Sequence, residues 1–307
     1  MKALRIVFMG TPDFAVASLD AICNSRHEVA GVVTVADKPA GRGQQLSMSP
    51  VKKYAMEHQI PVLQPLKLRD ENFLEELKKL QADLFVIVAF RMLPEQVWSM
   101  PPLGSVNLHG SLLPRYRGAA PINRAIMNGE TETGVTVFFL QQEIDTGKVI
   151  RRTVIPIGEN TTAGELHDEM MVIGAKVLVE ALDEIASGNV NAIAQDTLIS
   201  GGENVIHAPK IFKEDCKIDW SMSCHHVHDF IRGLSPYPAA WTMFGNKTLK
   251  IFSGKKILGK SIPDEWSTDG KESLEYRCAD GTYSVLELQL EGKKRMRVEE
   301  FLRGTRI

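Results

Sequence analysis

The chain has 307 residues, which is too long for one ordinary hydrophobic core and predicts about two domains. Hydrophobic residues make up 44% and charged residues 24%, a balance that excludes an intrinsically disordered protein. No apolar run approaches the roughly 18 residues that a membrane span requires, so we expect no membrane partner. The net charge of −2 argues against a protein that binds nucleic acid over its whole surface.

The cysteine pattern indicates a reducing environment. Cys23, Cys216, Cys224 and Cys278 lie far apart and form no C-x-x-C pair. This spacing favours free thiols over a disulfide framework and predicts a cytoplasmic protein. The histidines after Cys224 create a C-x7-C-H-H-x-H spacing that matches no zinc signature, so we expect no metal site.

Short apolar runs alternate with helical patterns over the first two hundred residues. The predicted strands are Arg5–Met9, Val29–Val35, Leu84–Ala89, Ser105–Leu108, Gly134–Leu140 and Lys148–Ile155. The predicted helices are Asp13–Asn24, Val51–His58, Asn72–Leu80, Pro121–Met127 and Ala163–Ala186. Strands that alternate with helices indicate a Rossmann-like α/β sheet, in which ligands bind beyond the carboxyl ends of the strands. The first turn lacks G-x-G-x-x-G, which argues against a dinucleotide.

The residue pattern changes after Gly201-Gly202. Short β-prone segments, separated by Gly, Pro and Asp, predict a small β-barrel there. The segments are Thr248–Phe252, Tyr283–Leu290 and Arg295–Phe301, with one helix near His225–Gly233. We therefore predict two domains, 1–203 and 204–307. Residues 204–307 hold 17 lysines and arginines against 14 acidic residues, which leaves 19 against 24 elsewhere. That mild excess fits a polyanionic ligand at the tail domain, or ordinary surface charge.

The strongest candidate for catalysis is the strand that ends at Gly110. Asn107 and His109 are two residues apart, so their side chains project from the same face, while Leu108 points into packing. Acyl transfer to an amine develops an oxyanion, for which an Asn amide is a suitable donor. A neighbouring histidine could donate to the same oxygen or move a proton. On spacing alone, an Asn-x-His pair on a strand is more often hydrogen-bonded polar structure than a catalytic pair.

Two further segments add to this candidate site. Leu112 and Leu113 form an apolar pair in a loop that ends in Pro and Gly, and a flat heteroaromatic ligand would cover such a pair. Asp145 lies in a turn with glycine two residues on, where a carboxylate could accept an amine proton or orient His109. A third segment, Ala36–Pro50, is a long irregular loop around Arg42, and long loops in compact domains are often functional.

Taken together, several segments resemble one enzyme family, the formyltransferases that use 10-formyltetrahydrofolate. The segments are Phe8–Phe14, Asp37–Gly43, Asn107–Ile122, Gly134–Val137, Ile144–Gly147 and Ser235–Ala240. They span nearly the whole chain. The fold that this resemblance implies is a Rossmann-like formyltransferase domain followed by a smaller OB-like β-barrel.

The resemblance also implies roles for the site residues. Asn107 and His109 would stabilise the formyl oxyanion, and Asp145 would help to remove the proton from the acceptor amine. The folate-binding residues would be Ser111, Leu112, Leu113 and Pro114. The implied reaction transfers the formyl group of the co-substrate 10-formyltetrahydrofolate to methionyl initiator tRNA, for the initiation of translation.

Features outside the catalytic segment narrow the implied acceptor to tRNA. Arg42 and its loop would contact the acceptor end of the tRNA, and the tail domain would hold the stem. Phosphate contacts require Lys and Arg, which the run at Lys293–Arg297 could provide, although a solvated strand face explains that run too. We expect the protein to be a monomer.

Two alternatives to this function stay open. A relative that formylates a 4-amino-sugar nucleotide would carry a similar tail domain, whereas an enzyme for glycinamide ribonucleotide would leave the tail unexplained. A non-catalytic RNA-binding relative would not need Asn107, His109 and Asp145 together. The chain also departs from the family at Phe90-Arg91, where Tyr-Gly is usual, and at Ala36, where Pro is common. If the usual glycine has a positive φ, arginine there requires strain or a different loop.

Overall fold

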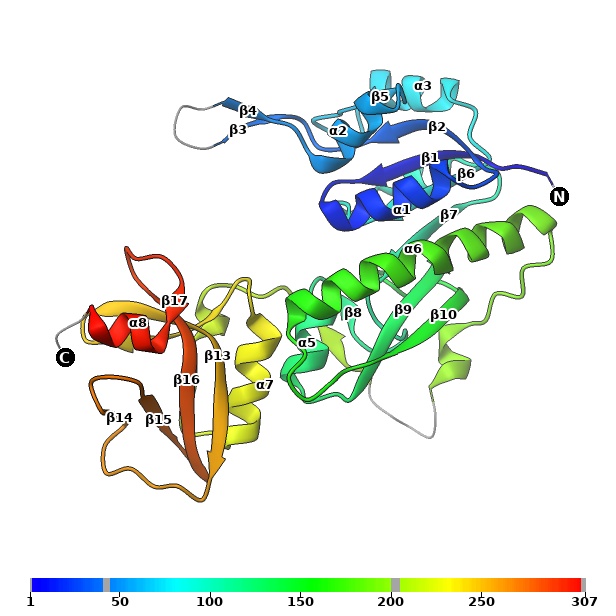
Figure 1. The fold of residues 1–307 in the computed structure, drawn as a ribbon. Helices are drawn as coiled ribbons and strands as arrows, with labels where there is room; N and C mark the ends of the chain where they lie inside the picture. The colour runs from blue at the N-terminus through cyan, green and yellow to red at the C-terminus, as the bar shows by residue number, and fades with distance from the viewer. Residues whose placement is uncertain (1, 41–44, 200–204, 305–307) are drawn as a thin grey trace. The chain divides into compact units, whose positions relative to one another are not determined.

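The computed structural model describes residues 2–40, 45–199 and 205–304. The chain divides into two compact units (Figure 1). Unit 1 contains Met1–Gly118, Gly134–Ile155 and His167–His207, and unit 2 contains Ala119–Thr133, Pro156–Leu166 and Ala208–Ile307. The predicted boundary between residues 203 and 204 lies within the segment 200–204, which is outside the described residues.

Unit 1 is built on a seven-stranded sheet in the order β10-β9-β7-β6-β1-β2-β5. Its strands are β1 (Arg5–Gly10), β2 (Glu28–Val33), β5 (Val62–Leu63), β6 (Leu84–Val88), β7 (Ser105–His109), β9 (Glu132–Phe139) and β10 (Val149–Pro156). The strands from β7 to β5 pair in parallel, while β9 pairs with β7 in the antiparallel direction. The predicted Rossmann-like α/β domain is confirmed, with a mixed sheet.

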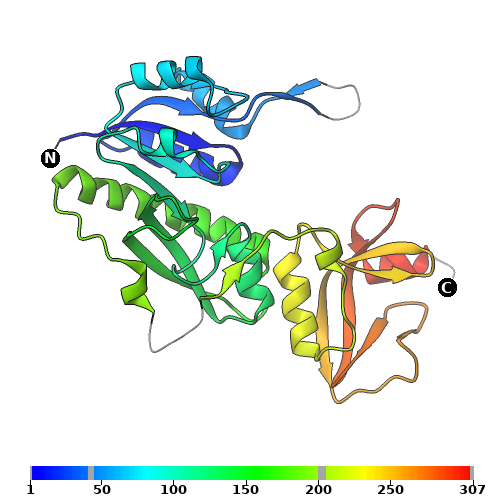
Figure 2. The same ribbon diagram turned by 180° about the vertical axis from the view of Figure 1, so that it is seen from behind.

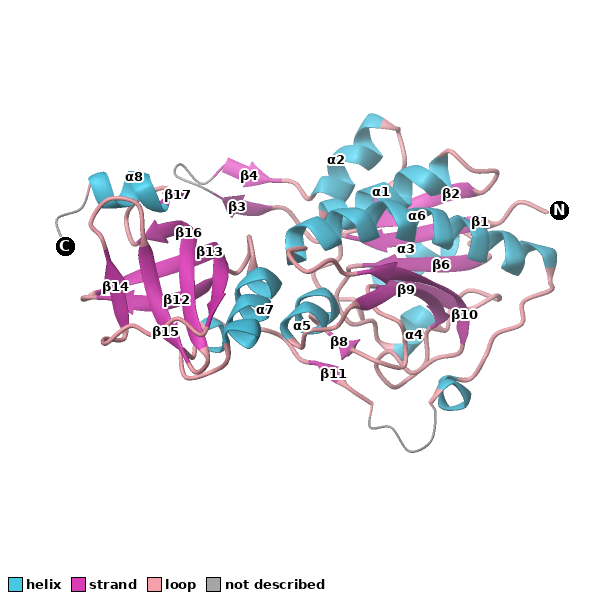
Figure 3. Ribbon diagram, turned by 60° about the horizontal axis from the view of Figure 1, so that its bottom comes forward, coloured by secondary structure: helices cyan, strands magenta, loops and turns pink. Residues whose placement is uncertain are grey.

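Helices cover both faces of this sheet. They are α1 (Asp13–Cys23), α2 (Pro50–Glu57), α3 (Glu71–Lys79), α4 (Glu95–Trp98) and α6 (Ala163–Ser187). Helices α3 and α4 bury Phe73, Leu77 and Val97 against one face, in a cluster with Phe85 and Ile87. Helices α1 and α6 lie together over the opposite face (Figures 2 and 3).

Local signals set the ends of several of these helices. The Asp70 side chain accepts a hydrogen bond from the backbone N–H of Phe73 and so caps α3. Helix α6 ends where Gly188 takes a φ of 74°, which confirms the predicted C-cap because glycine adopts this conformation without a Cβ clash.

Unit 2 is an antiparallel half-barrel with a helix against it. Its strands are β12 (Ala240–Phe244), β13 (Lys247–Leu258), β14 (Trp266–Thr268), β15 (Leu274–Cys278), β16 (Gly281–Leu290) and β17 (Met296–Arg297). Its helices are α5 (Pro121–Met127), α7 (Cys224–Leu234) and α8 (Val298–Arg303). Ile231 of α7 is buried with Leu249 and Tyr283 of the sheet, which forms a core separate from that of unit 1. The predicted small β-rich domain is confirmed.

Two local predictions differ from the structure. The strand predicted over Arg295–Phe301 is confirmed only at β17, and the chain is helical from Val298, because Val298, Phe301 and Leu302 bury one side at helical spacing. The segment predicted as irregular over Ala36–Pro50 contains an antiparallel hairpin of β3 (Lys38–Ala40) and β4 (Gln45–Ser47). Elements that we did not predict include β5, α4, β12, β14 and β15, together with β8 (Arg117–Gly118), β11 (His207–Ala208), and the 3-10 turns η1 (Gln195–Leu198) and η2 (Glu214–Cys216).

A search of the helices in the described ranges found no segment long and apolar enough to cross a lipid bilayer.

Candidate active site

The sheet presents Asn107 and His109 on one face of β7, as predicted. Leu108, between them, is buried on the other face, where Gly174 of α6 packs directly against its side chain. Asn107 lies between Ile87 of β6 and Phe138 of β9 and is half-buried. Both polar side chains therefore project from a strand that is held on both edges.

The imidazole of His109 is oriented by two groups. Its Nε2 lies 2.9 Å from the carbonyl oxygen of Tyr116, and because a carbonyl only accepts, Nε2 carries a proton in this arrangement. Its Nδ1 lies 3.9 Å from Oδ2 of Asp145. The Phe138 ring meets the imidazole edge to face, with centroids 6.4 Å apart. Only 7% of His109 is exposed, so the ring has little freedom to turn.

The predicted folate-binding loop is fixed to β9 by one buried hydroxyl. Thr136, the neighbour of His109 on β9, donates from Oγ1 to the carbonyl of Ser111 at 2.6 Å. The same oxygen accepts from the backbone N–H of Leu113 at 3.1 Å. The Ser111 hydroxyl in turn donates to the carbonyl of Arg115 at 2.7 Å. The loop that follows β7 is therefore held close to His109.

The apolar pair of this loop packs on the protein itself. Leu113 and Pro114 are buried, and Leu113 joins Phe138 and Val149 in a small core cluster. Leu112 is half-buried and lies over Gly134, where a Cβ would come within 2.5 Å of the leucine Cδ2. Leu112 is therefore the member of the pair that keeps exposed surface, and the folate-binding role of the loop stays a prediction.

Asp145 reaches His109 by a return path. Strand β9 runs antiparallel to β7, so Leu140 stands at the level of Ser105, where its N–H donates to the Ser105 carbonyl at 2.8 Å. From there to His109 is about 13 Å of strand, four residues at roughly 3.3 Å each. Asp145 has a φ of 55°, and its Oδ2 accepts from the backbone N–H of Gly118 at 2.9 Å. The turn thus folds back over the sheet face.

The closeness of this turn to β9 requires glycine at position 147. A Cβ there would stand 1.6 Å from the carbonyl oxygen of Phe139. A buried glutamine, Gln195, holds the other side of the turn by donating to the carbonyls of Asp145 and Gly147 at 2.8 and 2.9 Å. Sequence reasoning missed Gln195, because a single glutamine in a polar stretch carries no periodic signal.

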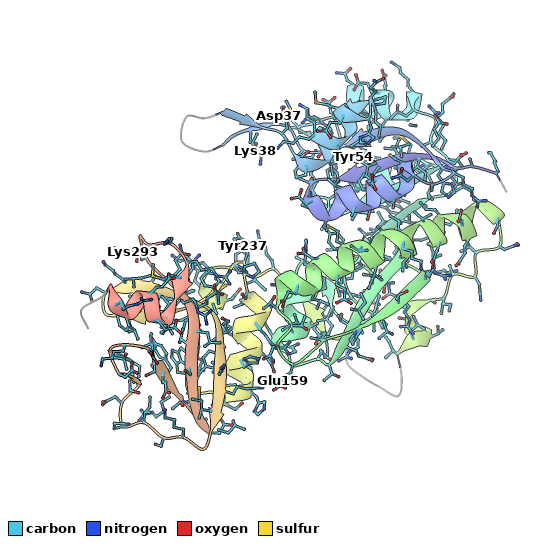
Figure 4. All side chains as sticks on the ribbon, viewed as in Figure 1. Asp37, Lys38, Tyr54, Glu159, Tyr237 and Lys293 are labelled. Atoms are coloured by element: carbon cyan, nitrogen blue, oxygen red, sulfur yellow. The ribbon has the colours of Figure 1, made fainter. Side chains whose placement is uncertain are left out.

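Arg42, the residue predicted to contact tRNA, lies outside the described residues, but the base of its hairpin is described. Asp37 and Lys38 stand where the hairpin leaves the body of unit 1 (Figure 4). The Asp37 carboxylate pairs with the Lys52 ammonium at 2.5 Å and accepts from the Gln64 amide at 2.9 Å. The hydrogen bond from Lys52 holds the pKa of Asp37 below its usual value, so this clamp is charged at neutral pH.

The departure at Phe90-Arg91 is accommodated without positive φ at the arginine. The left-handed residue is Ala89, with a φ of 47°. The Arg91 guanidinium donates to the carbonyls of Pro65 and Leu66, and burial lowers its pKa. Arg91 therefore ties the end of β6 to the loop after β5, and the strand end differs from a Tyr-Gly turn.

The basic run of unit 2 is partly engaged within the fold. Arg295 pairs with Glu287 and its guanidinium lies 4.3 Å from the centroid of Phe252. Arg297 lies 3.6 Å from Glu299. Lys293, labelled in Figure 4, is exposed, which leaves it available as a contact for an anionic ligand.

No group of three or more His, Cys, Asp or Glu side chains is placed to hold a metal ion in the portion of the chain that the structure describes. Cys216 and Cys224 are buried free thiols there.

Two family models match the chain. The formyl transferase model covers residues 4–182, and the model of the formyl transferase C-terminal domain covers residues 210–306. The chain belongs to the formyl transferase family and carries both of its domains.

Similar curated proteins extend over the full length. One from Bacteroides fragilis, named methionyl-tRNA formyltransferase, is 52% identical over 98% of this chain and 95% of its own length. Another of that name, from Flavobacterium johnsoniae, is 48% identical over 99% of this chain and 97% of its own.

Solved structures share the fold at lower identity. An N-formyltransferase from Helicobacter canadensis, in complex with folinic acid and dTDP-3-aminofucose, superposes with a TM-score of 0.68 at 20% identity. That match covers 95% of this chain and all of the other. A glycinamide ribonucleotide transformylase from Symbiobacterium toebii reaches 0.51 at 20% identity and covers 61% of this chain and 89% of its own.

The Asp145 turn yields a first prediction. Gly147→Ala should lower the free energy of unfolding by more than about 3 kcal/mol, because the added methyl group collides with backbone rather than with a flexible side chain. Urea denaturation measures the loss. Gly188→Ala is the matched control: its Cβ would meet nothing within 4 Å, so it should cost only the strain of a left-handed residue, about 1 kcal/mol. Equal losses at the two positions would contradict the predicted collision.

Proposed function

We propose that the protein transfers the formyl group of 10-formyltetrahydrofolate to the amino group of methionyl initiator tRNA, and that it acts in the cytoplasm as a monomer. The observation that carries the proposal is full-length similarity, 52% over 98% of the chain, to relatives named methionyl-tRNA formyltransferase. A likeness confined to the catalytic domain would have left the acceptor open.

The chemistry follows from the arrangement around His109. The amine of the acceptor attacks the formyl carbon, and negative charge develops on the formyl oxygen. The Asn107 amide, on the same strand face, is the donor for that oxygen, and one such donor lowers a barrier by about 3 kcal/mol. Asp145 takes up the amine proton and orients His109, whose Nδ1 is 3.9 Å away. To act as a second donor or as a proton carrier, His109 exchanges its contact with the Tyr116 carbonyl or with Asp145, because both ring nitrogens face these groups in the described arrangement.

The substrates are assigned to the surrounding segments. In this proposal Ser111, Leu112, Leu113 and Pro114 form the folate-binding loop. Leu112 keeps exposed side-chain surface, while the other three residues are buried, and the hydrogen bonds of Thr136 hold the loop in place. Arg42, which lies in the sequence between β3 and β4, contacts the acceptor end of the tRNA; the base of this hairpin carries the charged clamp of Asp37 and Lys52. Unit 2 contacts the tRNA stem, with exposed lysines such as Lys293 on its phosphates.

A second candidate acceptor is a 4-amino-sugar nucleotide. It is favoured by the fold shared over 95% of the chain with the Helicobacter canadensis N-formyltransferase, whose structure holds a dTDP-aminosugar. That likeness is one of fold at 20% identity, whereas the tRNA assignment rests on 52% identity.

A comparison of the two acceptors in separate reactions distinguishes the tRNA from the sugar nucleotide as substrate. The protein is given 10-formyltetrahydrofolate with methionyl initiator tRNA in one reaction and with a 4-amino-sugar nucleotide in the other, and folate deformylation is followed by absorbance. We expect turnover with the tRNA alone. Turnover with only the sugar nucleotide would overturn the proposal.

The catalytic assignment makes its own prediction. Asn107→Ala, His109→Ala and Asp145→Ala should each reduce the single-turnover rate by at least about 100-fold, because each removes a donor or base at the reacting centre. The Kd for folate, measured by fluorescence quenching, should change little. A near-normal rate for any one variant would remove that residue from the mechanism.

The hairpin assignment predicts a selective loss. Arg42→Ala should raise the KM for methionyl-tRNA at least about tenfold, the equivalent of one lost charged contact of about 1.4 kcal/mol, and leave the folate Kd unchanged. Lys53→Ala, which removes a positive charge from the exposed side of α2, is the matched control and should change neither. Parallel losses of tRNA use and folate binding in Arg42→Ala would indicate a folding defect instead.

A further inference from the structure

The Asp145 turn needs an anchor that its own sequence does not supply. The antiparallel direction of β9 carries the chain away from His109, and the turn must come back over the sheet face. Asp145 itself has a φ of 55°, a left-handed conformation that is uncommon for non-glycine residues and that contacts from its surroundings stabilise. The groups that stabilise it come from outside the turn.

Gln195 is the main one of these groups. Its side chain is 2% exposed, and every polar atom of its amide is used. Nε2 donates to the carbonyl of Asp145 at 2.8 Å and to the carbonyl of Gly147 at 2.9 Å. Oε1 accepts from Nε and Nη2 of Arg117 at 3.0 and 2.7 Å. A buried, fully bonded amide of this kind holds its partners in one geometry.

Gln195 is itself fixed at both ends of its segment. Two residues earlier, Ile193 forms a two-way backbone bridge with Val149 at the start of β10, with both N···O distances at 2.8 Å. Three residues later, Leu198 packs against the cluster of Leu113 and Phe138. The glutamine therefore stands on rigid structure and can hold the turn.

Arg117 links Gln195 to the segment that binds the Asp145 carboxylate. Its guanidinium is bound to Gln195, and the next residue, Gly118, donates its backbone N–H to Asp145 Oδ2. The backbone of the turn and the side chain of Asp145 are thus held by one connected network, which Gln195 joins. His109 Nδ1 lies 3.9 Å from the same oxygen, Oδ2.

We propose that Gln195, together with Arg117, is a positioning residue for formyl transfer, which sets the Asp145 carboxylate against His109 and the incoming amine. The inference rests on the proposed function of Asp145. A displacement of about 1 Å at a reacting group can cost about 100-fold in rate, so a residue that never touches substrate can control turnover.

A double-mutant cycle on the full-length protein tests this role. Gln195→Met keeps the length of the side chain and removes all four hydrogen bonds, and Asp145→Asn removes the carboxylate. Single-turnover formylation of methionyl-tRNA is measured for the wild type, both single variants and the double variant. We expect Gln195→Met to slow the rate at least tenfold in the wild type and less than twofold in the Asp145→Asn background, because its effect passes through Asp145. The KM for tRNA should stay within twofold.

Two further variants guard the result. Gln195→Glu keeps the acceptor for Arg117 but loses the donors to the turn, so it should slow the reaction in the same way if Gln195→Met fails to fold. Gln141→Met is the matched control, since Gln141 bonds the Thr146 hydroxyl of the same turn from an exposed position. Its rate should stay within threefold of the wild type.

The outcomes separate this inference from the proposed function. Equal rate losses from Gln195→Met in both backgrounds would make Gln195 merely structural and overturn the inference, as would a normal rate in Gln195→Met or Gln195→Glu. If the wild type formylates a sugar nucleotide and not methionyl-tRNA, the proposed acceptor fails and the cycle is run with that acceptor. If the wild type transfers formyl to neither acceptor, both the proposed function and the inference about Gln195 are overturned.

Discussion

The antiparallel pairing of β9 with β7 is the constraint on which the candidate site depends. It places Thr136 beside His109 and Phe138 beside Asn107, so β7 is paired on both edges. It also directs the chain toward Ser105, at the start of β7, whereas His109 lies at the other end of that strand. The close approach of Gly147 to Phe139 and the return of the turn over the sheet face follow from that direction.

The site is held mainly by hydrogen bonds to backbone carbonyls. Tyr116 orients the imidazole, Thr136 binds the carbonyl of Ser111, and Gln195 binds two carbonyls of the Asp145 turn. Buried donors of this kind cost little when bonded and much when left unpaired. The loops around the strand therefore have one favoured arrangement, which is what a preorganised site for a developing oxyanion requires.

Charged side chains hold in place the parts of unit 1 that lie farther from His109. Asp37 and Lys52 fix the base of the hairpin that bears Arg42, and Arg91 joins the end of β6 to the loop after β5. Arg91 binds carbonyls of Pro65 and Leu66 on that loop, and the left-handed residue at this strand end is Ala89.

The sequence by itself determined which residues share a face and where elements end. Asn107 and His109 project together and Leu108 opposite because strand periodicity is local, and Gly188 ends α6 because its conformation is local as well. Only the tertiary structure decided the direction of β9, the return of Asp145 and the part of Gln195. The contacts responsible join residues 27, 50 and 78 positions apart, between Gly118 and Asp145, Gln195 and Asp145, and Arg117 and Gln195. Such contacts depend on how whole elements pack, which no short pattern of residues specifies.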